Sequence, residues 1–308
     1  MTPQSSRGSA IVDMRCRPPL PEYLEYFDIP RISWHSRRVG AATVAPSFVE
    51  RSMHRFLGEL DASGTTIAVV QGRNSPAVFM GKQFNAAFIA NERLAELQRD
   101  YPGRFIGFAG IDVSNQAHDA LREIERAIRE LGLAGIFIEP GRALQSHPAD
   151  PRLYPLYEKC IELGVPVNIM SGPYAGADIA ATDPVHIDRV CTRYPDLRVI
   201  LGHGGYPYVQ EIVGVAFKHV NLYVSPDIYM FAPGAGGYVE AANGALRDQM
   251  LYGSAYPLRP LEQTVSDTLA LGLSPEARNA YFFGNAARLL RIALPHDAMA
   301  PPRTTEDQ

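Results

Sequence analysis

The feature that most constrains this 308-residue sequence is an alternation of short apolar runs with longer amphipathic segments. The apolar runs are rich in Val, Ile and Leu, as is typical of strands buried on both faces. They lie at residues 9–16, 65–72, 104–112, 133–140, 165–172, 197–205, 220–227 and 248–257. Helical periodicity between them is clearest at 118–132, where Leu121, Ile124 and Ile128 fall on one face. The pattern therefore predicts repeated strand–helix units.

Eight such units in a chain of this length predict a (β/α)₈ TIM barrel, which belongs to the α/β class. A doubly wound open sheet is the alternative, but no Gly-rich fingerprint opens a helix after the first strand. We expect one domain over residues 1–294 and a flexible, Pro-rich C-terminal tail at 295–308. An irregular insertion at 18–45, after the first strand, is expected over the barrel mouth, with extra C-terminal helices at 259–271 and 275–291.

A single helix is also predicted from Ser47 to the residue before Gly64. Ser47 is a plausible N-cap, since Glu50 stands at capping-box distance. Gly64 is a plausible stop signal.

The overall composition narrows the class of partner. The formal net charge is −4, so no global basic field attracts nucleic acid or a membrane surface. The three cysteines are too few and too scattered for a disulfide framework. No apolar run approaches the roughly 18 residues that span a bilayer. We therefore expect a cytoplasmic protein with no nucleic-acid or membrane partner.

In a (β/α)₈ barrel the reactive groups lie where the strands end. The polar and other ligand-capable residues at these ends are Arg15, Arg17, Arg73, Asn74, Glu139, Met170, Ser171, His203, Ser225, Asp227, Ser254 and Tyr256. Arg15 and Arg17 are two apart and therefore lie on the same side of an extended chain.

The motifs at these strand ends resemble those of the amidohydrolase superfamily. The segments "LGHGGYP", "YGSAYP" and "FFGNAARLL" carry the likeness, in an order that spans nearly the whole chain. They are most similar to the amidohydrolase-related branch that includes aminocarboxymuconate semialdehyde decarboxylase and γ-resorcylate decarboxylase. The resemblance implies a (β/α)₈ barrel that usually holds a divalent metal, often zinc. It also implies a homodimer or larger assembly.

The family's metal-ligand positions are largely replaced in this chain. Where the family carries an Asp-x-His-x-His motif on strand one, Asp13 is followed by Arg15 and Arg17. Met170 stands at the strand-five His position and Ala255 at the strand-eight Asp position, so His203 alone is kept. Zinc needs about three His, Cys or carboxylate ligands, and a guanidinium has no lone pair to give. We therefore expect no metal and no other cofactor.

Several of these residues also have a structural interpretation. Arg15 and Arg17 could pair with Glu139 or Asp227 across the barrel mouth, or they could clamp a carboxylate. His203 could be a buried structural histidine or a general acid or base. Four tyrosines near the same face could stack on one another or present a flat surface to a planar substrate: Tyr206, Tyr208, Tyr229 and Tyr256.

The functional hypothesis is a metal-independent hydrolase for a small, carboxylate-bearing substrate that is cyclic or aromatic. His203, Asp227 and Glu139 are the expected catalytic residues. The expected substrate-binding residues are Arg15, Arg17, Arg73, Met170, Ser254 and Tyr256. The alternatives are a non-oxidative decarboxylase or other lyase of the same family, and a catalytically dead binding protein.

Overall fold

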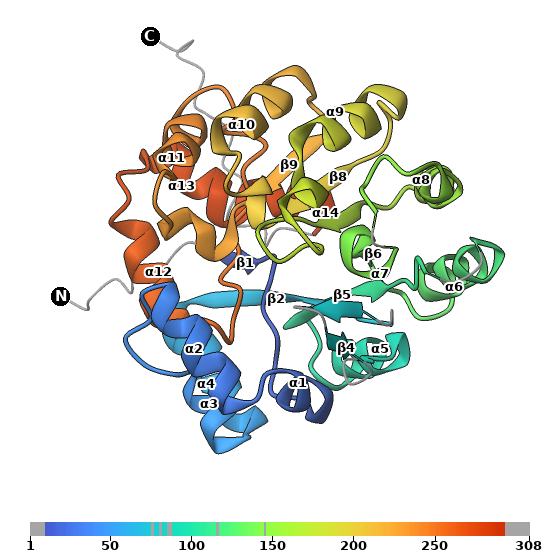
Figure 1. The fold of residues 1–308 in the computed structure, drawn as a ribbon. Coiled ribbons are helices and arrows are strands. Elements are labelled where there is room, and N and C mark those ends of the chain that lie inside the picture. The colour runs from blue at the N-terminus through green and yellow to red at the C-terminus, as the bar shows by residue number, and fades with distance from the viewer. Residues whose placement is uncertain are drawn as a thin grey trace, which may run out of the picture.

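A computed structural model describes residues 10–74, 77–79, 82–84, 88–114, 117–144 and 146–292. The proposed tail at 295–308 lies outside these residues. The strands gather at the centre of the molecule and the longer helices surround them (Figure 1). This arrangement confirms the predicted α/β fold of the TIM-barrel type.

The central sheet contains seven parallel strands in the order β1-β2-β5-β6-β7-β8-β9. Their bounds are β1 Ile11–Asp13, β2 Thr65–Gln71, β5 Phe105–Gly110, β6 Gly135–Ile138, β7 Val167–Met170, β8 Val199–Gly202 and β9 Leu222–Ser225. Each strand pairs in parallel with the next strand in this order, as where Asn168 of β7 faces Ile200 of β8, and the β1–β2 pairing contains one register shift. All their carboxyl ends therefore point to one mouth.

The eighth predicted strand, at residues 248–257, closes the ring without becoming a regular strand. Its Met250 forms a parallel bridge with Val224 of β9, and its Tyr256 forms one with Cys16 beyond β1. Between these bridges the Tyr252 amide donates to the Tyr281 carbonyl instead of to a neighbouring strand. Pairing is therefore intermittent, and the prediction of a continuous eighth strand was wrong.

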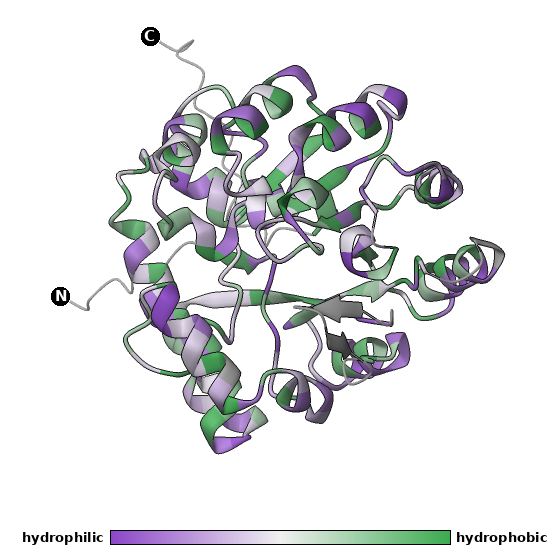
Figure 2. Cartoon of the chain, viewed as in Figure 1, coloured by the Kyte–Doolittle hydropathy of each residue, from purple (hydrophilic) through white to green (hydrophobic). Residues whose placement is uncertain are grey.

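Helices cover the outside of the sheet. Their bounds are α4 Met53–Ser63, α5 Asn91–Asp100, α6 Ala117–Arg129, α8 Tyr154–Leu163, α9 Pro184–Arg193, α10 Val209–Lys218, α11 Gly236–Asn243 and α12 Leu261–Leu269. In Figure 2 the strands β8 and β9 are mainly hydrophobic, whereas the surrounding helices alternate hydrophobic and hydrophilic faces. Burial of the hydrophobic faces against the sheet is the main force that stabilises such a layer.

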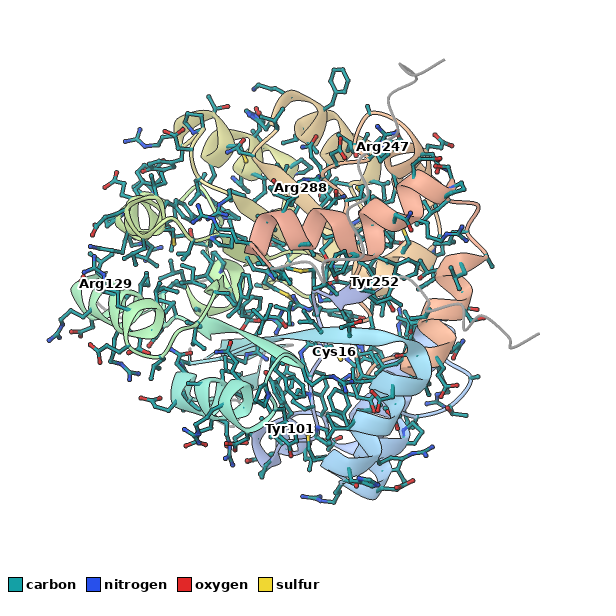
Figure 3. All side chains as sticks on the ribbon, turned by 180° about the vertical axis from the view of Figure 1, so that it is seen from behind. Cys16, Tyr101, Arg129, Arg247, Tyr252 and Arg288 are labelled. Carbon is teal, nitrogen blue, oxygen red and sulfur yellow. The ribbon has the colours of Figure 1, made fainter. Side chains whose placement is uncertain are left out.

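The end of the barrel opposite the mouth is closed by the C-terminal helices α13 Pro275–Asn279 and α14 Asn285–Leu290, joined by a π-helical turn at Ala280–Gly284. Seen from behind, the helix that carries Arg288 crosses the barrel (Figure 3). Leu289 packs with Val12, Val69 and Ile200 inside the barrel. The barrel is thus a packed core and not a pore.

The insertion at 18–45 is more ordered than the sequence predicts. It contains α1 Pro21–Tyr26 and α2 Ile29–Arg38, and side chains from both helices line the cavity at the barrel mouth. A short hairpin of β3 Ala77–Phe79 and β4 Lys82–Phe84 was also not predicted. The helix that follows this hairpin, α5, begins only at Asn91.

The predicted helix after Ser47 is broken in two. α3 Pro46–Glu50 ends at Arg51, whose φ of 52° is left-handed, and Ser52 caps α4 by accepting from the Arg55 amide. The Ser47 amide instead donates to Glu59 Oε1 at 2.9 Å. Gly64 ends α4 with φ 76°, as predicted.

The remaining short helices follow strand ends or connect longer helices: α7 Pro140–Ala143, η1 Pro151–Leu153, η2 Ile179–Thr182, η3 His203–Gly205 and η4 Asp227–Phe231. None of the helices in the described parts of the chain is both long and apolar enough to cross a membrane.

Candidate active site

A cavity of about 560 Å³ opens at the carboxyl ends of the strands. Its wall includes Arg15, Arg17, Arg73, Glu139, Met170 and His203 from the predicted site. The insertion contributes Tyr23, Tyr26, Phe27, His35 and Arg38. These six residues thus lie together at one cavity, and side chains of the insertion line it as well.

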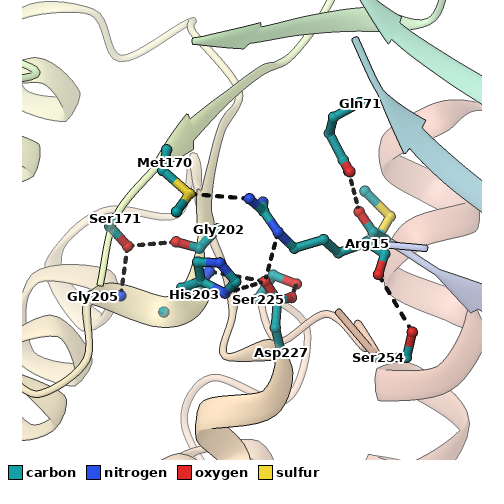
Figure 4. A network of polar contacts seen from close by, with 12 residues as sticks. Arg15, Gln71, Met170, Ser171, Gly202, His203, Gly205, Ser225, Asp227 and Ser254 are labelled. Carbon is teal, nitrogen blue, oxygen red and sulfur yellow. Dashed lines mark hydrogen bonds and ion pairs between the residues drawn. The ribbon is translucent and has the colours of Figure 1, made fainter. Parts of the chain in front are cut away.

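Arg15 and His203 share the carboxylate of Asp227 (Figure 4). Arg15 Nε lies 3.6 Å from Asp227 Oδ2, and His203 Nδ1 lies 2.9 Å from the same oxygen. The His203 contact has the length of a hydrogen bond, but Nδ1 is not aligned to make one. The His203 amide also donates to Asp227 Oδ2, at 3.1 Å. The carboxylate thus holds the backbone of His203 and lies against its ring.

These contacts determine the protonation of the pair. Burial, reinforced by the nearby Arg15 cation, lowers the pKa of His203 to about 4, although Asp227 acts in the opposite direction. Burial alone would raise the pKa of Asp227, but His203 and Arg15 hold it below its usual value. The pair is therefore a neutral imidazole beside a carboxylate at neutral pH.

Arg15 is held mainly by weak contacts. Its Nη2 donates to the Met170 sulfur at 3.0 Å, and its guanidinium lies 5.2 Å from the Phe137 ring centroid. Nε and Nη1 have no hydrogen-bond partner. Burial and the neighbouring Arg17 lower the pKa of Arg15 to about 10, so it stays protonated at neutral pH. Arg15 therefore brings a buried and only loosely compensated positive charge to the cavity wall.

Arg17 Nη1 donates to the Tyr256 carbonyl at 3.2 Å. Its guanidinium lies 5.2 Å from the Phe27 ring centroid. No carboxylate forms an ion pair with Arg17 among the described residues, so its charge is not neutralised by direct contact.

Glu139 lies between two arginines. Arg73 Nη2 donates to Glu139 Oε1 at 2.7 Å, and Arg142 Nη1 donates to the same oxygen at 3.0 Å. Burial would raise the pKa of Glu139, but Arg73 and Arg142 hold it below its usual value. An ionised carboxylate held by two cations is a poor proton carrier, so the geometry favours a positioning role for Glu139 over the expected catalytic one.

Sequence reasoning missed Arg142 and Tyr26. Arg142 follows Glu139 by three residues, and on one turn of α7 that spacing places the two side chains on one face. Tyr26 lies on α1, in the part of the chain read as irregular. The spacing to Glu139 could have indicated Arg142, whereas no local pattern indicated Tyr26.

Ser254 and Tyr256 do not line the cavity. Both are fully buried, and the Ser254 amide donates to Asp13 Oδ1 at 2.8 Å. The Tyr256 hydroxyl donates to Glu59 and lies 2.5 Å from the Ser47 hydroxyl. Their expected contact with substrate does not fit these positions, because their polar groups are directed into the protein.

The ends of three consecutive strand segments share an unusual backbone. His203, Asp227 and Ala255 have φ of 64°, 55° and 53°, in the left-handed region that non-glycine residues rarely adopt. Such conformations cost roughly 1–3 kcal/mol each and cluster at functional sites. Asn and Asp tolerate this region better than Ala does. Ala255 therefore keeps a backbone suited to a carboxylate without the carboxylate.

The residues present do not fit the divalent metal that the resemblance implies. Among the described residues, no three His, Cys, Asp or Glu side chains converge in a way that could hold an ion. Arg15 lies between His203, Asp227 and Met170, and its permanent positive charge disfavours a dication there. Met170 offers a soft sulfur that suits zinc poorly beside nitrogen and oxygen donors.

The family model described as "Amidohydrolase" matches residues 31–292. The chain belongs to the amidohydrolase family. This amidohydrolase-family chain is also similar to a solved, uncharacterised TIM-barrel protein from Bordetella bronchiseptica. The two share 38% identity with a TM-score of 0.85, over 92% of this chain and 98% of that one.

Two curated relatives have named activities. A 2-keto-4-carboxy-3-hexenedioate hydratase from Sphingobium is 30% identical over 51% of this chain and 52% of its own length. A gamma-resorcylate decarboxylase from Polaromonas is 24% identical over 66% of this chain and 75% of its own length. The chain thus spans about half the length of the first relative. A solved 2,6-dihydroxybenzoate decarboxylase shares the fold, with a TM-score of 0.67 at 18% identity, over 92% of this chain and 98% of that one.

Proposed function

We propose that this amidohydrolase-family chain is a metal-independent lyase that removes carbon dioxide from a small, planar substrate carrying two carboxylates. The observation that carries the proposal is the charge of the cavity wall. Four buried arginines, Arg15, Arg17, Arg73 and Arg142, line the cavity with one buried carboxylate, Glu139. A second buried carboxylate, Asp227, contacts Arg15 without lining the cavity. The difference, four minus two, is an excess of two positive charges. Buried charges are costly unless paired, so a dianion is the ligand that balances this wall.

Arg15 and Arg17 are the groups that would hold the dianion. Arg17 forms no ion pair with a carboxylate among the described residues, and Arg15 approaches Asp227 only to 3.6 Å. A charge-assisted hydrogen bond contributes roughly 1.5–3 kcal/mol. Arg73 is less suited to this role than the sequence suggests, because its guanidinium is engaged by Glu139.

A flat substrate fits the aromatic part of the wall. Tyr206 and Tyr229 stack with ring centroids 4.9 Å apart and planes 9° apart, and His203 meets the Tyr229 ring edge-on at 5.2 Å. Stacked aromatic rings present a flat apolar surface beside the cations.

The choice of reaction rests on the relatives. Decarboxylases and a hydratase are both lyases, and their names specify carboxylated substrates. Loss of carbon dioxide leaves an electron pair on the substrate, and cations held in a buried site stabilise such developing negative charge. Arg15 and Arg17 would supply this stabilisation without a metal.

Hydrolysis remains a second candidate because of one observation. His203 is neutral and oriented by Asp227, an arrangement that suits a general base for water. In that reaction the arginines would hold the carboxylate of a lactone or cyclic amide and polarise its carbonyl.

A substrate panel tests the proposal. Carboxylated phenols and aromatic dicarboxylates would be assayed for released carbon dioxide, and carboxylated lactones for ring opening, each with and without chelator. Release of carbon dioxide from a dicarboxylate, at a rate that the chelator does not change, supports the proposal. Ring opening alone would replace it with the hydrolase, and binding without turnover would indicate a non-catalytic protein.

A further inference from the structure

Tyr26 lies in the cavity wall beside two cations. The Arg73 guanidinium lies 4.6 Å from the Tyr26 ring centroid, and Arg142 Nη1 donates to the Tyr26 hydroxyl at 3.4 Å. Tyr26 comes from α1 and His203 from the end of β8, and these elements lie on opposite sides of the barrel centre in Figure 1. Two groups capable of moving protons therefore line different walls of one cavity.

The charges around Tyr26 are unequal. Glu139 accepts from both Arg73 and Arg142, so one carboxylate serves two guanidiniums. Arg17, which precedes α1, adds a more distant positive charge. The Tyr26 phenol is a further acidic group in contact with both Arg73 and Arg142. This surrounding favours the phenolate, the form that tyrosine normally reaches only near pH 10.

The proposed decarboxylation, on which this inference rests, needs a proton donor that His203 does not supply. When carbon dioxide leaves, the carbon that carried it must gain a proton. A neutral imidazole is a weak acid, and His203 is neutral except at low pH. Glu139 and Asp227 are ionised and carry no proton to give.

We propose that Tyr26 is the general acid of the reaction, a tyrosine whose proton is made available by Arg73 and Arg142. The bond between the carboxylate carbon and the substrate carbon breaks, and carbon dioxide leaves. The bonding electron pair stays on the substrate carbon and takes the hydroxyl proton of Tyr26. Tyr26 becomes a phenolate stabilised by the two guanidiniums and regains a proton from water. Burial alone would raise the pKa of Tyr26, but Arg73 and Arg142 outweigh burial and Glu139 and lower it to about 7.

The first test needs no substrate. Ionisation of tyrosine raises absorbance near 295 nm, so wild-type protein would be titrated between about pH 5.5 and 9. Burial raises the pKa of Tyr23 and Tyr229, which also line the cavity, so neither contributes in this range. We expect one tyrosine to ionise with a midpoint near 7. The step should be lost in Tyr26→Phe and kept in the control Tyr208→Phe, which alters a partly buried tyrosine outside the cavity.

Two charge variants give opposite shifts that a merely structural tyrosine would not. Arg142→Gln removes a cation and should move the midpoint upward. Glu139→Gln removes the competing carboxylate and should move it downward. Absence of a tyrosine step below about pH 9 in wild type, or its persistence in Tyr26→Phe, overturns the assignment.

The second test uses the substrate found in the panel. Tyr26→Phe should lower kcat by roughly 100-fold or more, the usual contribution of a general acid, with a smaller effect on KM. The alkaline limb of the kcat profile, which reports loss of the proton, should disappear. An unchanged kcat and pH profile would rule out Tyr26 as the acid. If wild type turns over no dicarboxylate, the decarboxylase proposal fails and the catalytic role fails with it, whereas the absorbance titration still decides whether Tyr26 ionises.

Discussion

His203 Nδ1 lies 2.9 Å from Asp227 Oδ2, and both residues adopt a left-handed backbone at the ends of neighbouring strands. The Asp227 carboxylate also accepts the His203 amide and faces Arg15. One buried carboxylate therefore orients a histidine and an arginine toward the same cavity. Arg15 supplies positive charge at the point where the resemblance implies a metal.

The first prediction concerns stability at acid pH. The pKa of His203 is about 4 in the folded protein and roughly 6.5 when unfolded, so the unfolded chain binds the proton first as the pH falls. The free energy of unfolding should therefore fall between about pH 6.5 and 4. The expected loss from pH 7 to 4.5 is roughly 2–3 kcal/mol, at about 1.4 kcal/mol per pKa unit. The stabilisation from Asp227, whose pKa is lowered, is lost only below about pH 4.

Urea unfolding of wild type and His203→Asn at both pH values measures this effect. Asn suits the left-handed backbone at this position and has no charge to gain. The variant should lose less stability than wild type on acidification. Equal losses would show that His203 is not the buried group that takes up the proton.

The second prediction concerns the anion clamp. Arg15→Met removes a buried guanidinium with two unbonded nitrogens and keeps a long apolar side chain. Isophthalate, a planar aromatic dicarboxylate, serves as the probe ligand. Loss of one charge-assisted bond, roughly 1.5–3 kcal/mol, should weaken its binding about tenfold or more. Calorimetric titration gives the dissociation constant. Arg104→Met, which breaks a peripheral ion pair with Asp61, is the matched control and should leave it unchanged.

The third prediction separates structural from substrate-binding roles at the eighth strand segment. Tyr256→Phe removes the hydroxyl that donates to Glu59, so the buried Glu59 carboxylate loses one hydrogen-bond donor. We expect the free energy of unfolding to fall by about 1–3 kcal/mol, with isophthalate affinity unchanged. The backbone carbonyl that accepts from Arg17 is retained. A large loss of affinity in a stably folded variant would instead return Tyr256 to the substrate site.

The fold was predictable where local pattern and tertiary structure agree. Apolar runs located the seven regular strands, because strands buried on both faces need no polar residues. The eighth segment was not predictable in detail, since the Ser254 amide bonds to Asp13 from the far end of the chain. The break at Arg51 was missed for a similar reason, because Ser47 is held by Glu59 and Tyr256 and does not act as a cap.

The part of the candidate site that lies at strand ends was predictable from the sequence. Arg15, His203 and Asp227 were identified because parallel strands bring their carboxyl ends to one mouth. Tyr26 and Arg142 lie on short helices beyond the strand ends, where no periodic pattern marks a residue as facing the cavity. Their importance arises from contact with Glu139 and Arg73, which only the folded chain brings together.

The central claim is that this arginine-lined site works without a metal. Its most direct test is elemental analysis of protein purified without chelator, combined with a measurement of turnover before and after chelation. Arg15, Met170 and Ala255 stand at positions where the family's ligands are expected, and none of them suits zinc. We predict well under one transition metal per chain and turnover that chelation leaves unchanged. The account would be contradicted if the protein contained one metal ion per chain that is lost when His203 is replaced, and if chelation abolished the activity and the metal restored it.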